Sequence, residues 1–587
     1  MINFIKHTLQ ASAAKSGFTA TLLASLAMTA CTDSFLDKEP DERTNISSVE
    51  NITSLLTTAY PNANYGWMCE LSSDNIMDQN SKHLPASTNS AQNETHYNLS
   101  SYGRQDDELF RFEPVKSSTS TDTPAELWES FYGSINTVNE ALQAIDELGI
   151  ADEDMSEQLR AAKGEALLIR AYDHWVLVNV FSQVYKDSLT SKNDVGVPYV
   201  TTTTTDYGLT YDRSNVTDTY ARIQADLEQG LKDISDINYQ KPKWHFNTEA
   251  AHAFAARFYL FMRKYDKVIE HANAVLGTDN AQLLPKMFDY APLDDCMYSD
   301  DFANVWQSPY IFSNLMLMDT YSIITRHARG HRYAQGGLVA RAIFYHNHSS
   351  LWPRWAGNPS IFVTGLFGSG NESYYPSWVS EQFQYSDKVA GIGYAHTIRR
   401  EFTAAELLLE RAEAKIMTDD LDGASDDLCT YHKSIMNFSM TSKVTYQANN
   451  GMHALTDDII HSWYAKKTNN NYNCFDDWDF TQQISSSFVV KADAIPYMNC
   501  LNYFRRFETN FTGKRFFDLK RWGMEWTHEY GPNNEKYTVK ANDPRLAMEV
   551  PQDAIAMGLE PSRPITKADS TSIQQKVTFQ QFFWGKK

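Results

Sequence analysis

The chain is poor in cysteine, with six among its 587 residues and no CxxC pair. Five of them are widely spaced through the chain: Cys69, Cys296, Cys429, Cys474 and Cys500. This spacing fits neither a zinc site nor the dense disulfide framework of a small secreted domain, although one or two disulfides remain open. We therefore expect no structural metal.

Basic residues are also scarce: 52 Lys and Arg stand against 73 Asp and Glu, which gives a net charge of −21. A surface this acidic repels phosphate backbones, so nucleic acid is not expected as a partner. Hydrophobic residues make up 42% of the chain and charged residues 21%. These are globular proportions, which exclude a disordered chain.

Catalytic motifs are missing as well. The sequence has no GxSxG, no Walker loop, no HExxH and no glycine-rich dinucleotide turn beside a strand. Carboxylate pairs occur at Asp294–Asp295 and Asp476–Asp477, but 73 acids produce adjacent pairs by chance. Neighbours in sequence also do not flank one glycosidic bond. We expect a non-catalytic protein without a cofactor, and a surface glycoside hydrolase is the less favoured alternative.

Two segments carry part of a metal-site pattern. His346 and His348 are separated by one residue, which is more typical of a solvated loop than of a ligand pair. The segment Asp419–Asp427 is acidic like a calcium loop, but its third position is Leu and its Gly comes one place early. We expect it to open a helix, where acids favour the positive end of the dipole.

Long hydrophobic runs are absent after the first thirty residues. Gly17–Ala30 is uncharged and mostly apolar, and Lys6 and Lys15 precede it without any acid. Such a run is too short to cross a hydrocarbon core of ~30 Å, but it suits a secretory signal peptide.

The run ends at Met28-Thr29-Ala30-Cys31, which is similar to the bacterial lipobox, in which the cysteine receives lipid. We expect residues 1–30 to be a lipoprotein signal peptide, Cys31 to be the lipid attachment site and residues 31–45 to be a lipidated tether. Attachment to the membrane would then be through the lipid anchor only. An ordinary leader with a coincidental cysteine is the alternative.

Apolar residues then recur at intervals of three and four, which predicts helices. The predicted segments are 128–145, 159–181, 220–234, 251–261, 268–276, 403–417 and 421–436, with Thr217-Asp218 as the cap of the third. They form pairs with short connections, and small residues lie where two helices approach. We expect a mainly α fold, a tetratricopeptide-like scaffold of helical hairpins over about 126–277 and 400–437. An irregular helical domain without repeats is the alternative.

Aromatic residues are plentiful: 32 Tyr, 31 Phe and 13 Trp. Many lie in stretches rich in Gly, Pro, Asn and Ser with poor periodicity, above all 283–380. A connection of that length is usually functional or forms a subdomain. We expect long aromatic-rich loops that form a binding subdomain, followed by a C-terminal region at 441–587.

Six motifs, in the same order, resemble those of the SusD/RagB family of outer-membrane nutrient-binding lipoproteins from Bacteroidetes. They are Cys31–Asp37, Trp128–Asn139, Gly164–Ala171 with Val195–Pro198, Thr248–Leu260, Glu406–Ala414 and Arg505–Trp522. The resemblance covers nearly the whole mature chain, so residues 46–587 are identified as a SusD-like domain. Thr512 departs from the pattern, since the family commonly has Glu there. We interpret Glu508, Arg515, Asp518 and Arg521 as structural, and expect a Glu165–Arg170 network with close helix packing at Gly164.

The resemblance implies a lipid-anchored protein exposed at the cell surface. It would act as a lid over a SusC-like TonB-dependent transporter, capturing oligosaccharide or polysaccharide ligands and delivering them to the channel. Some members take other nutrients, so a peptide-binding or purely structural lid subunit is the alternative.

Glycan binding requires flat apolar faces for the C–H face of a sugar and planar polar groups for its hydroxyls. The candidate contacts in the middle loops are Trp352, Arg354, Trp355, Asn358, Tyr374, Tyr375 and Trp378. The early loops add Trp67, Tyr97 and Tyr102. The alternative is that these rings cover the core beneath the loops.

Overall fold

The computed structural model describes residues 46, 48–83, 96–116, 120–203, 211–288, 299–344, 366–368, 373–376, 378–435, 455–465, 480 and 488–564. The chain divides into two units, Met1–Ser47 and Ser48–Lys587, and the fold given below is that of the second. Among the described residues, no helix has both the length and the apolar character that crossing a membrane requires.

Among the described residues, helices account for most of the regular structure, and the strands other than β7 (Ile392–Thr403) are short. The helices are α2 (Val49–Leu56), α3 (Gly66–Leu71), α4 (Arg104–Phe110), α5 (Pro124–Glu147), α6 (Glu157–Phe181), α7 (Val216–Asp233), α8 (Thr248–Phe261), α9 (Tyr265–Leu276), α10 (Asn280–Leu283), α11 (Ser299–Trp306), α12 (Ile324–Ala328), α13 (Gly337–Phe344), α14 (Ala404–Met417), α15 (Leu421–Ile435), α17 (Asp457–Tyr464), α18 (Ile495–Glu508), α19 (Lys514–Trp522) and α20 (Gln552–Ala556). The strands are β1 (Met77–Asp78), β2 (Asn314–Thr320), β3 (Tyr333–Ala334), β4 (Leu366–Gly368), β5 (Tyr374–Pro376), β6 (Gln382–Asp387), β7 (Ile392–Thr403), β8 (Trp526–Tyr530) and β9 (Glu535–Val539). The mainly α prediction is therefore confirmed.

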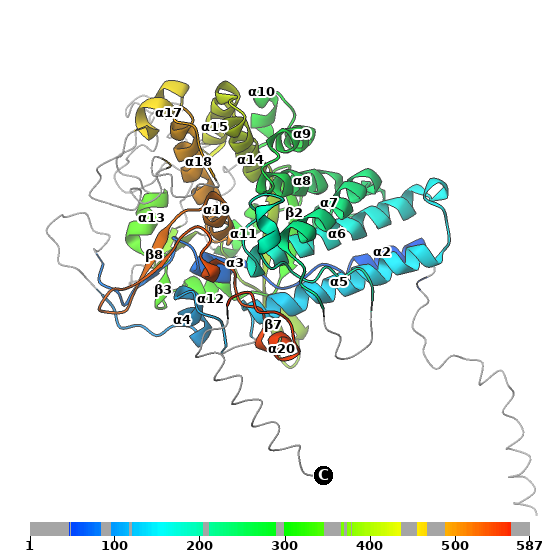
Figure 1. The fold of residues 1–587 in the computed structure, drawn as a ribbon, viewed down its shortest axis with the longest axis horizontal. Coiled ribbons are helices and arrows are strands. Elements are labelled where there is room, and N and C mark those ends of the chain that lie inside the picture. The colour runs from blue at the N-terminus through cyan, green and yellow to red at the C-terminus, as the bar shows by residue number, and fades with distance from the viewer. Residues whose placement is uncertain are drawn as a thin grey trace, which may run out of the picture. The chain divides into compact units, whose positions relative to one another are not determined.

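The helices pack as neighbouring pairs. α5 contacts α6, α6 contacts α7, α8 contacts α9, and α14 contacts both α9 and α15. Figure 1 shows the long α5 and α6 side by side, with α8, α9, α14 and α15 continuing the stack. The helical hairpin scaffold predicted from the periodicity is present.

Helix starts follow the capping residues in the sequence. Thr123 accepts a hydrogen bond from Glu126 N at the start of α5, where Pro124 also takes the first turn. Thr403 caps α14 in the same way. For α7 the predicted cap was wrong: Asn215, rather than Thr217-Asp218, accepts the hydrogen bond from Asp218 N. Asn, Thr and Asp side chains can all cap a helix, so residue type alone does not show which of these neighbouring residues caps α7.

Two glycines allow α6 and α7 to approach closely. A Cβ added at Gly164 would lie 2.6 Å from Ile234 N, and one at Gly230 would lie 2.8 Å from Leu168 Cγ. The predicted close packing at Gly164 is therefore confirmed.

The two charged residues that follow Gly164 on α6 do not pair with each other, so the predicted Glu165–Arg170 network is wrong. Glu165 accepts a hydrogen bond from the Tyr60 hydroxyl at 2.7 Å, whereas Arg170 donates to both carboxylate oxygens of Asp226. Both partners are distant in sequence, which helical spacing cannot reveal.

The C-terminal helices bind the early segment of the chain. Arg515 on α19 donates two hydrogen bonds to Asp74, at 2.9 and 2.8 Å. Glu70 on α3 accepts hydrogen bonds from Phe511 N and Gly513 N, and Gly513 has φ +80°. These contacts fix the position of α3 and agree with a structural role for Arg515.

The strands form small antiparallel sheets, in which the pairs β1–β3 and β2–β7 join distant segments and the other pairs are local hairpins. β1 pairs with β3, β4 with β5 and β8 with β9, while the largest sheet has the order β2–β7–β6. Many of these strands lie in 299–344 and 373–403, so the middle region holds more regular structure than its composition predicted. Most of its elements are short, and β2 pairs with the remote strand β7, so these elements produce no local periodicity.

Candidate functional site

Residues from the early loops and the middle region meet beside α3, α4 and α12. The pairing Asp78↔Tyr333 joins β1 to β3, and Gln79 N donates to Arg332 O at 2.8 Å. Arg332 N donates in turn to Ser100 O at 3.1 Å. The segment before α4 and the segment around β3 are therefore one structural unit, visible at the lower left of Figure 1.

Four rings in this unit form a ladder, which we call the 102/327 ladder: Trp67, His327, Tyr102 and His331. The Trp67 and His327 rings stack with 4.8 Å between centroids and 14° between planes. Tyr102 meets His327 edge-on at 4.6 Å and His331 at 5.3 Å. Trp67 is 1% exposed and Tyr102 is 39% exposed, so the ladder runs from the core to the surface.

Carboxylates surround the buried imidazole of His327. Asp106 Oδ2 lies 3.6 Å from its Nδ1, and Asp122 Oδ2 lies 3.8 Å from its Nε2. Burial raises the pKa of Asp122 to about 6, although His327, Ile323 N and the Ser322 hydroxyl all act to lower it. Neither ring nitrogen of His327 has a hydrogen-bond partner among the described residues, so its ring contacts with Trp67 and Tyr102 hold the imidazole in place.

An ion pair borders the exposed end of the ladder. Arg326 Nε and Nη2 bind the Glu381 carboxylate as a fork, at 2.8 and 2.5 Å. The hydrogen bond to Glu381, together with Tyr102, raises the pKa of the Arg326 guanidinium. An exposed aromatic ring thus lies beside a planar cation and a carboxylate, which is an arrangement suited to polyhydroxylated ligands.

The other predicted aromatics of the middle region lie deeper. Trp378 stacks on Trp306 at 4.6 Å, and the Arg400 guanidinium lies 3.9 Å from the Trp306 ring centre. Tyr375 is buried, with Arg329 at 5.8 Å from its ring centre. Trp378 and Tyr375 therefore pack beneath the surface, and their contacts do not favour direct contact with a ligand.

A family model with the description "Starch-binding associating with outer membrane" matches residues 34–260, and it is a SusD-like model. Over these residues the chain is similar to SusD-like proteins. No curated protein matches it.

Solved structures of SusD superfamily proteins share the fold of this chain. One from Bacteroides thetaiotaomicron is 16% identical, with 88% of this chain and 100% of that chain covered and a TM-score of 0.51. One from Bacteroides fragilis is 15% identical, with 88% and 99% covered and a TM-score of 0.53. A Bacteroides vulgatus protein, whose name gives sugar binding as its expected role, is 14% identical, with 88% and 99% covered and a TM-score of 0.55.

The structure places the predicted site residues in different surroundings. It brings Trp67 and Tyr102 together through His327, which sequence patterns did not single out. Trp67 lies one layer below the exposed rings, so its burial does not favour a direct ligand contact. Tyr97 is half-buried, with its backbone N donating to Gln79 O, and Tyr374 N donates to Gln335 O.

Some predictions lie outside the described residues and stay predictions. These are the lipid site Cys31 and the loop contacts Trp352, Arg354, Trp355 and Asn358. His346, His348 and the carboxylate pairs at 294–295 and 476–477 are outside as well.

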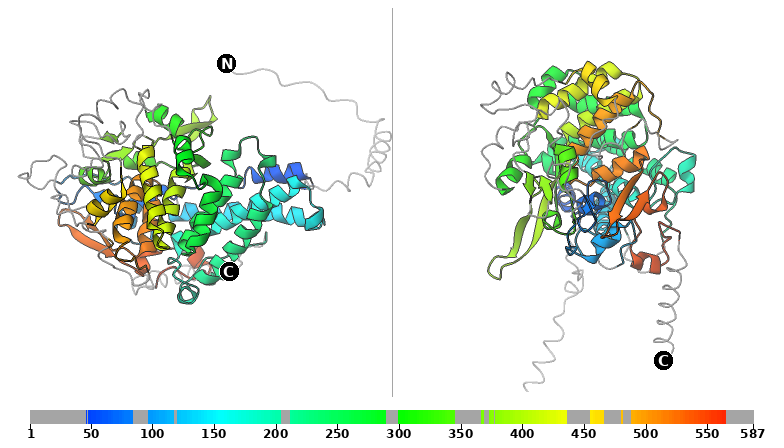
Figure 2. Two further views of the ribbon diagram at one scale, coloured as in Figure 1. Left: turned by 90° about the horizontal axis from the view of Figure 1, so that it is seen from above. Right: turned by 90° about the vertical axis from the view of Figure 1, so that its left-hand side faces the viewer.

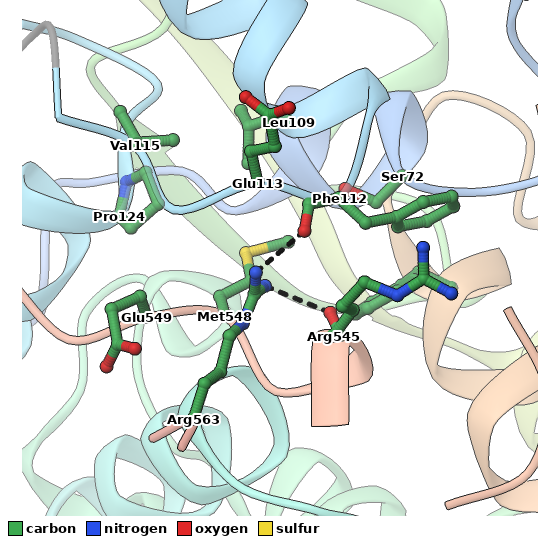
Figure 3. A pocket seen from close by; sticks show the side chains of 11 residues that line it. Ser72, Leu109, Phe112, Glu113, Val115, Pro124, Arg545, Met548, Glu549 and Arg563 are labelled. Carbon is green, nitrogen blue, oxygen red and sulfur yellow. Dashed lines mark hydrogen bonds between the residues drawn. The ribbon is translucent and has the colours of Figure 1, made fainter. Parts of the chain in front are cut away.

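A small cavity lies under α4, lined by residues that include Phe112, Met548, Glu549 and Arg563 (Figure 3). Arg563 donates hydrogen bonds to Phe112 O at 2.7 Å and to Arg545 O at 3.0 Å. With a volume of about 10 Å³, the cavity has room for about one water molecule and none for a sugar. Its role is structural.

The described residues contain no cluster of three or more His, Cys, Asp or Glu side chains that suits a metal ion. Within Asp419–Asp427 the helix α15 begins at Leu421, as predicted. Asp427 binds Arg411 and Lys415 at 2.7 and 2.9 Å, so its carboxylate serves an ion pair.

Proposed function

We propose that this SusD-like protein binds glycans at the cell surface and delivers them to a SusC-like TonB-dependent transporter. The observation that carries the proposal is the exposed Tyr102 ring beside the Arg326–Glu381 fork. The description of the family model as starch-binding agrees with this chemistry.

The geometry suits recognition of a sugar ring. The C–H face of a pyranose stacks on an aromatic face, and its hydroxyls need planar donors and acceptors beside that face. Tyr102 supplies the face, Arg326 the donors and Glu381 the acceptors. His327 and Trp67 hold the Tyr102 ring from below, so little freedom is lost on binding.

The expected affinity is modest. Aromatic stacking contributes about 0.5–1.5 kcal/mol beyond buried area, and exposed charged groups add little. Weak binding at one contact suits a protein that must release its ligand to a channel.

The proposal also includes a lipid anchor and a partner transporter. Lipid on Cys31 would attach the chain to the outer membrane with its SusD-like domain at the cell surface, and no catalytic step is required. The transporter would take the ligand from the surface around Tyr102.

Affinity gel electrophoresis of residues 32–587 against neutral and acidic polysaccharides tests the proposal. We expect one class of polysaccharide to retard the protein, and replacement of Trp352 and Trp355 by Ala to reduce the retardation. If no polysaccharide retards the protein, glycan capture by the isolated chain is contradicted. A peptide ligand or a purely structural lid subunit would then be favoured.

A further inference from the structure

The hairpin of β6 and β7 carries aromatic rings that the fold leaves uncovered. Phe383 is 45% exposed and Tyr385 is 51% exposed, and their rings meet edge-on at 5.0 Å. Figure 2 shows this yellow-green hairpin extending away from the helices. Two adjacent exposed rings on a strand are unusual for a chain that can place aromatics in its core.

Strand alternation fixes the side of the hairpin on which the rings lie. Phe383 pairs with Ala395 and Tyr385 pairs with Gly393, so these four residues share one face of the sheet. The partners on β7 are small, and a Cβ added at Gly393 would lie 2.7 Å from Phe383 Cε1. The two rings therefore lie over small residues with their outer faces open.

On β7 the same face leads inward to residues buried beside α3. Arg399 and Glu401 share the parity of Gly393 and Ala395 on β7, and both are buried. The Arg399 guanidinium lies 3.6 Å from the Tyr65 ring centre and donates to Asn64 Oδ1 at 2.9 Å. Tyr65 directly precedes α3, the helix that carries Trp67.

Glu381 lies between the surface around Tyr102 and the face of the hairpin that carries Phe383 and Tyr385. It lies immediately before β6 and two residues before Phe383, and it binds Arg326 beside Tyr102. A strand rises ~3.3 Å per residue, so Tyr385 lies about 13 Å beyond Glu381 along the chain. That length exceeds one sugar ring.

The composition of the strand favours a neutral carbohydrate over a charged partner. From Gln382 to Ser386 the chain reads Gln-Phe-Gln-Tyr-Ser, with no charge, in a protein whose net charge is −21. The order β2–β7–β6 also places β6 at an edge, where its outer backbone groups can meet hydroxyls.

We propose that Phe383 and Tyr385 form a second glycan-contacting platform that extends the Tyr102 surface, so that the preferred ligand is an extended neutral polysaccharide chain. This inference depends on the proposed glycan binding. The Tyr102 surface holds one part of the chain, and the hairpin contacts units further along. Long oligosaccharides therefore gain affinity from contacts with both surfaces, whereas short ones gain affinity from the Tyr102 surface only.

The test combines substitutions with a series of ligand lengths. Soluble starch, xylan, galactomannan and pullulan serve as gel probes, and a trisaccharide and a heptasaccharide of the retarding polymer then serve in calorimetry. We expect the double variant Phe383→Ala, Tyr385→Ala to bind the heptasaccharide about tenfold more weakly. Its trisaccharide affinity should match that of the original protein. Tyr310→Ala is the control, since Tyr310 is 91% exposed.

The outcomes separate this inference from the proposed function. The hairpin platform alone is overturned if a polysaccharide retards the original protein but the double variant loses affinity equally for both ligand lengths, or for neither. No retardation of the original protein by any probe overturns both. Unchanged glycan affinity combined with lost co-purification of a SusC-like transporter would assign the hairpin to a protein partner and overturn the inference. An unchanged unfolding midpoint shows that the double variant is folded.

Discussion

The ring of Tyr102 packs edge-on against the ring of His327, with 4.6 Å between centroids and 61° between planes. A buried imidazole thus supports an exposed phenol ring. His327 itself stacks on Trp67, so three residues from three segments set the position of one surface contact.

Replacement of Tyr102 tests this surface contact. We expect Tyr102→Ala to weaken glycan binding by about tenfold, because the stacking face is lost. Tyr102→Phe keeps the face and should lose less. Calorimetry with the retarding oligosaccharide measures both variants. Equal affinity of Tyr102→Ala and the original protein would exclude Tyr102 from the site, and Tyr310→Ala is the matched control.

Substitution of Gly164 tests whether α6 and α7 must approach closely at this position. Gly164→Ala places a Cβ 2.6 Å from Ile234 N, and overpacking against backbone costs about 1–3 kcal/mol. Gly133→Ala on α5 is the control, since no atom lies within 4 Å of its added Cβ. That control should stabilise by about 0.5–1 kcal/mol through helix propensity. Urea unfolding distinguishes them, and equal shifts for both variants would contradict the packing argument.

His174 gives a prediction for pH. Its Nδ1 bonds to Arg170 O and its Nε2 accepts from Val200 N, so the ring is neutral in the fold. Burial lowers its pKa from 6.5 to about 3. Its stabilising effect is therefore complete above pH 6.5 and is lost as the pH falls toward 3. In His174→Gln the free energy of unfolding should fall less over this range. Parallel pH profiles for the two proteins would contradict the assignment.

The buried ions between α14 and α19 give a stability prediction. Glu413 accepts hydrogen bonds from the Arg521 guanidinium and from Trp522 Nε1, while Asp518 binds Arg521 at 2.8 Å. Glu413→Ala leaves a buried cation short of a partner, so we expect a loss of about 3–5 kcal/mol. Glu270→Ala, in the exposed Lys267–Glu270 pair, should cost about 0–1 kcal/mol. Denaturant titration compares them, and similar losses would contradict the structural role.

The helices could be predicted because their signals are local. The apolar spacing of α5, α6, α14 and α15 and the cap Thr403 all lie within the segments they define. The partners of Glu165 and Arg170 could not be predicted, since Tyr60 and Asp226 reach them only in the folded chain.

The candidate site was predictable only in part. Residue type and loop composition selected Tyr102, whereas nothing in the sequence indicated that Trp67 would be buried beneath His327. His327 itself carries no motif: its importance comes from its position between two rings and two carboxylates. Phe383 and Tyr385 alternate along β6, but only the small partners on β7 leave them uncovered.

A crystal structure of residues 32–587 with an oligosaccharide of the retarding polysaccharide is the most direct test of glycan binding at Tyr102. We expect a sugar ring stacked on Tyr102, with hydroxyls bound to Arg326 or Glu381. A sugar bound elsewhere on the protein, with the Tyr102 ring unoccupied, would contradict this account.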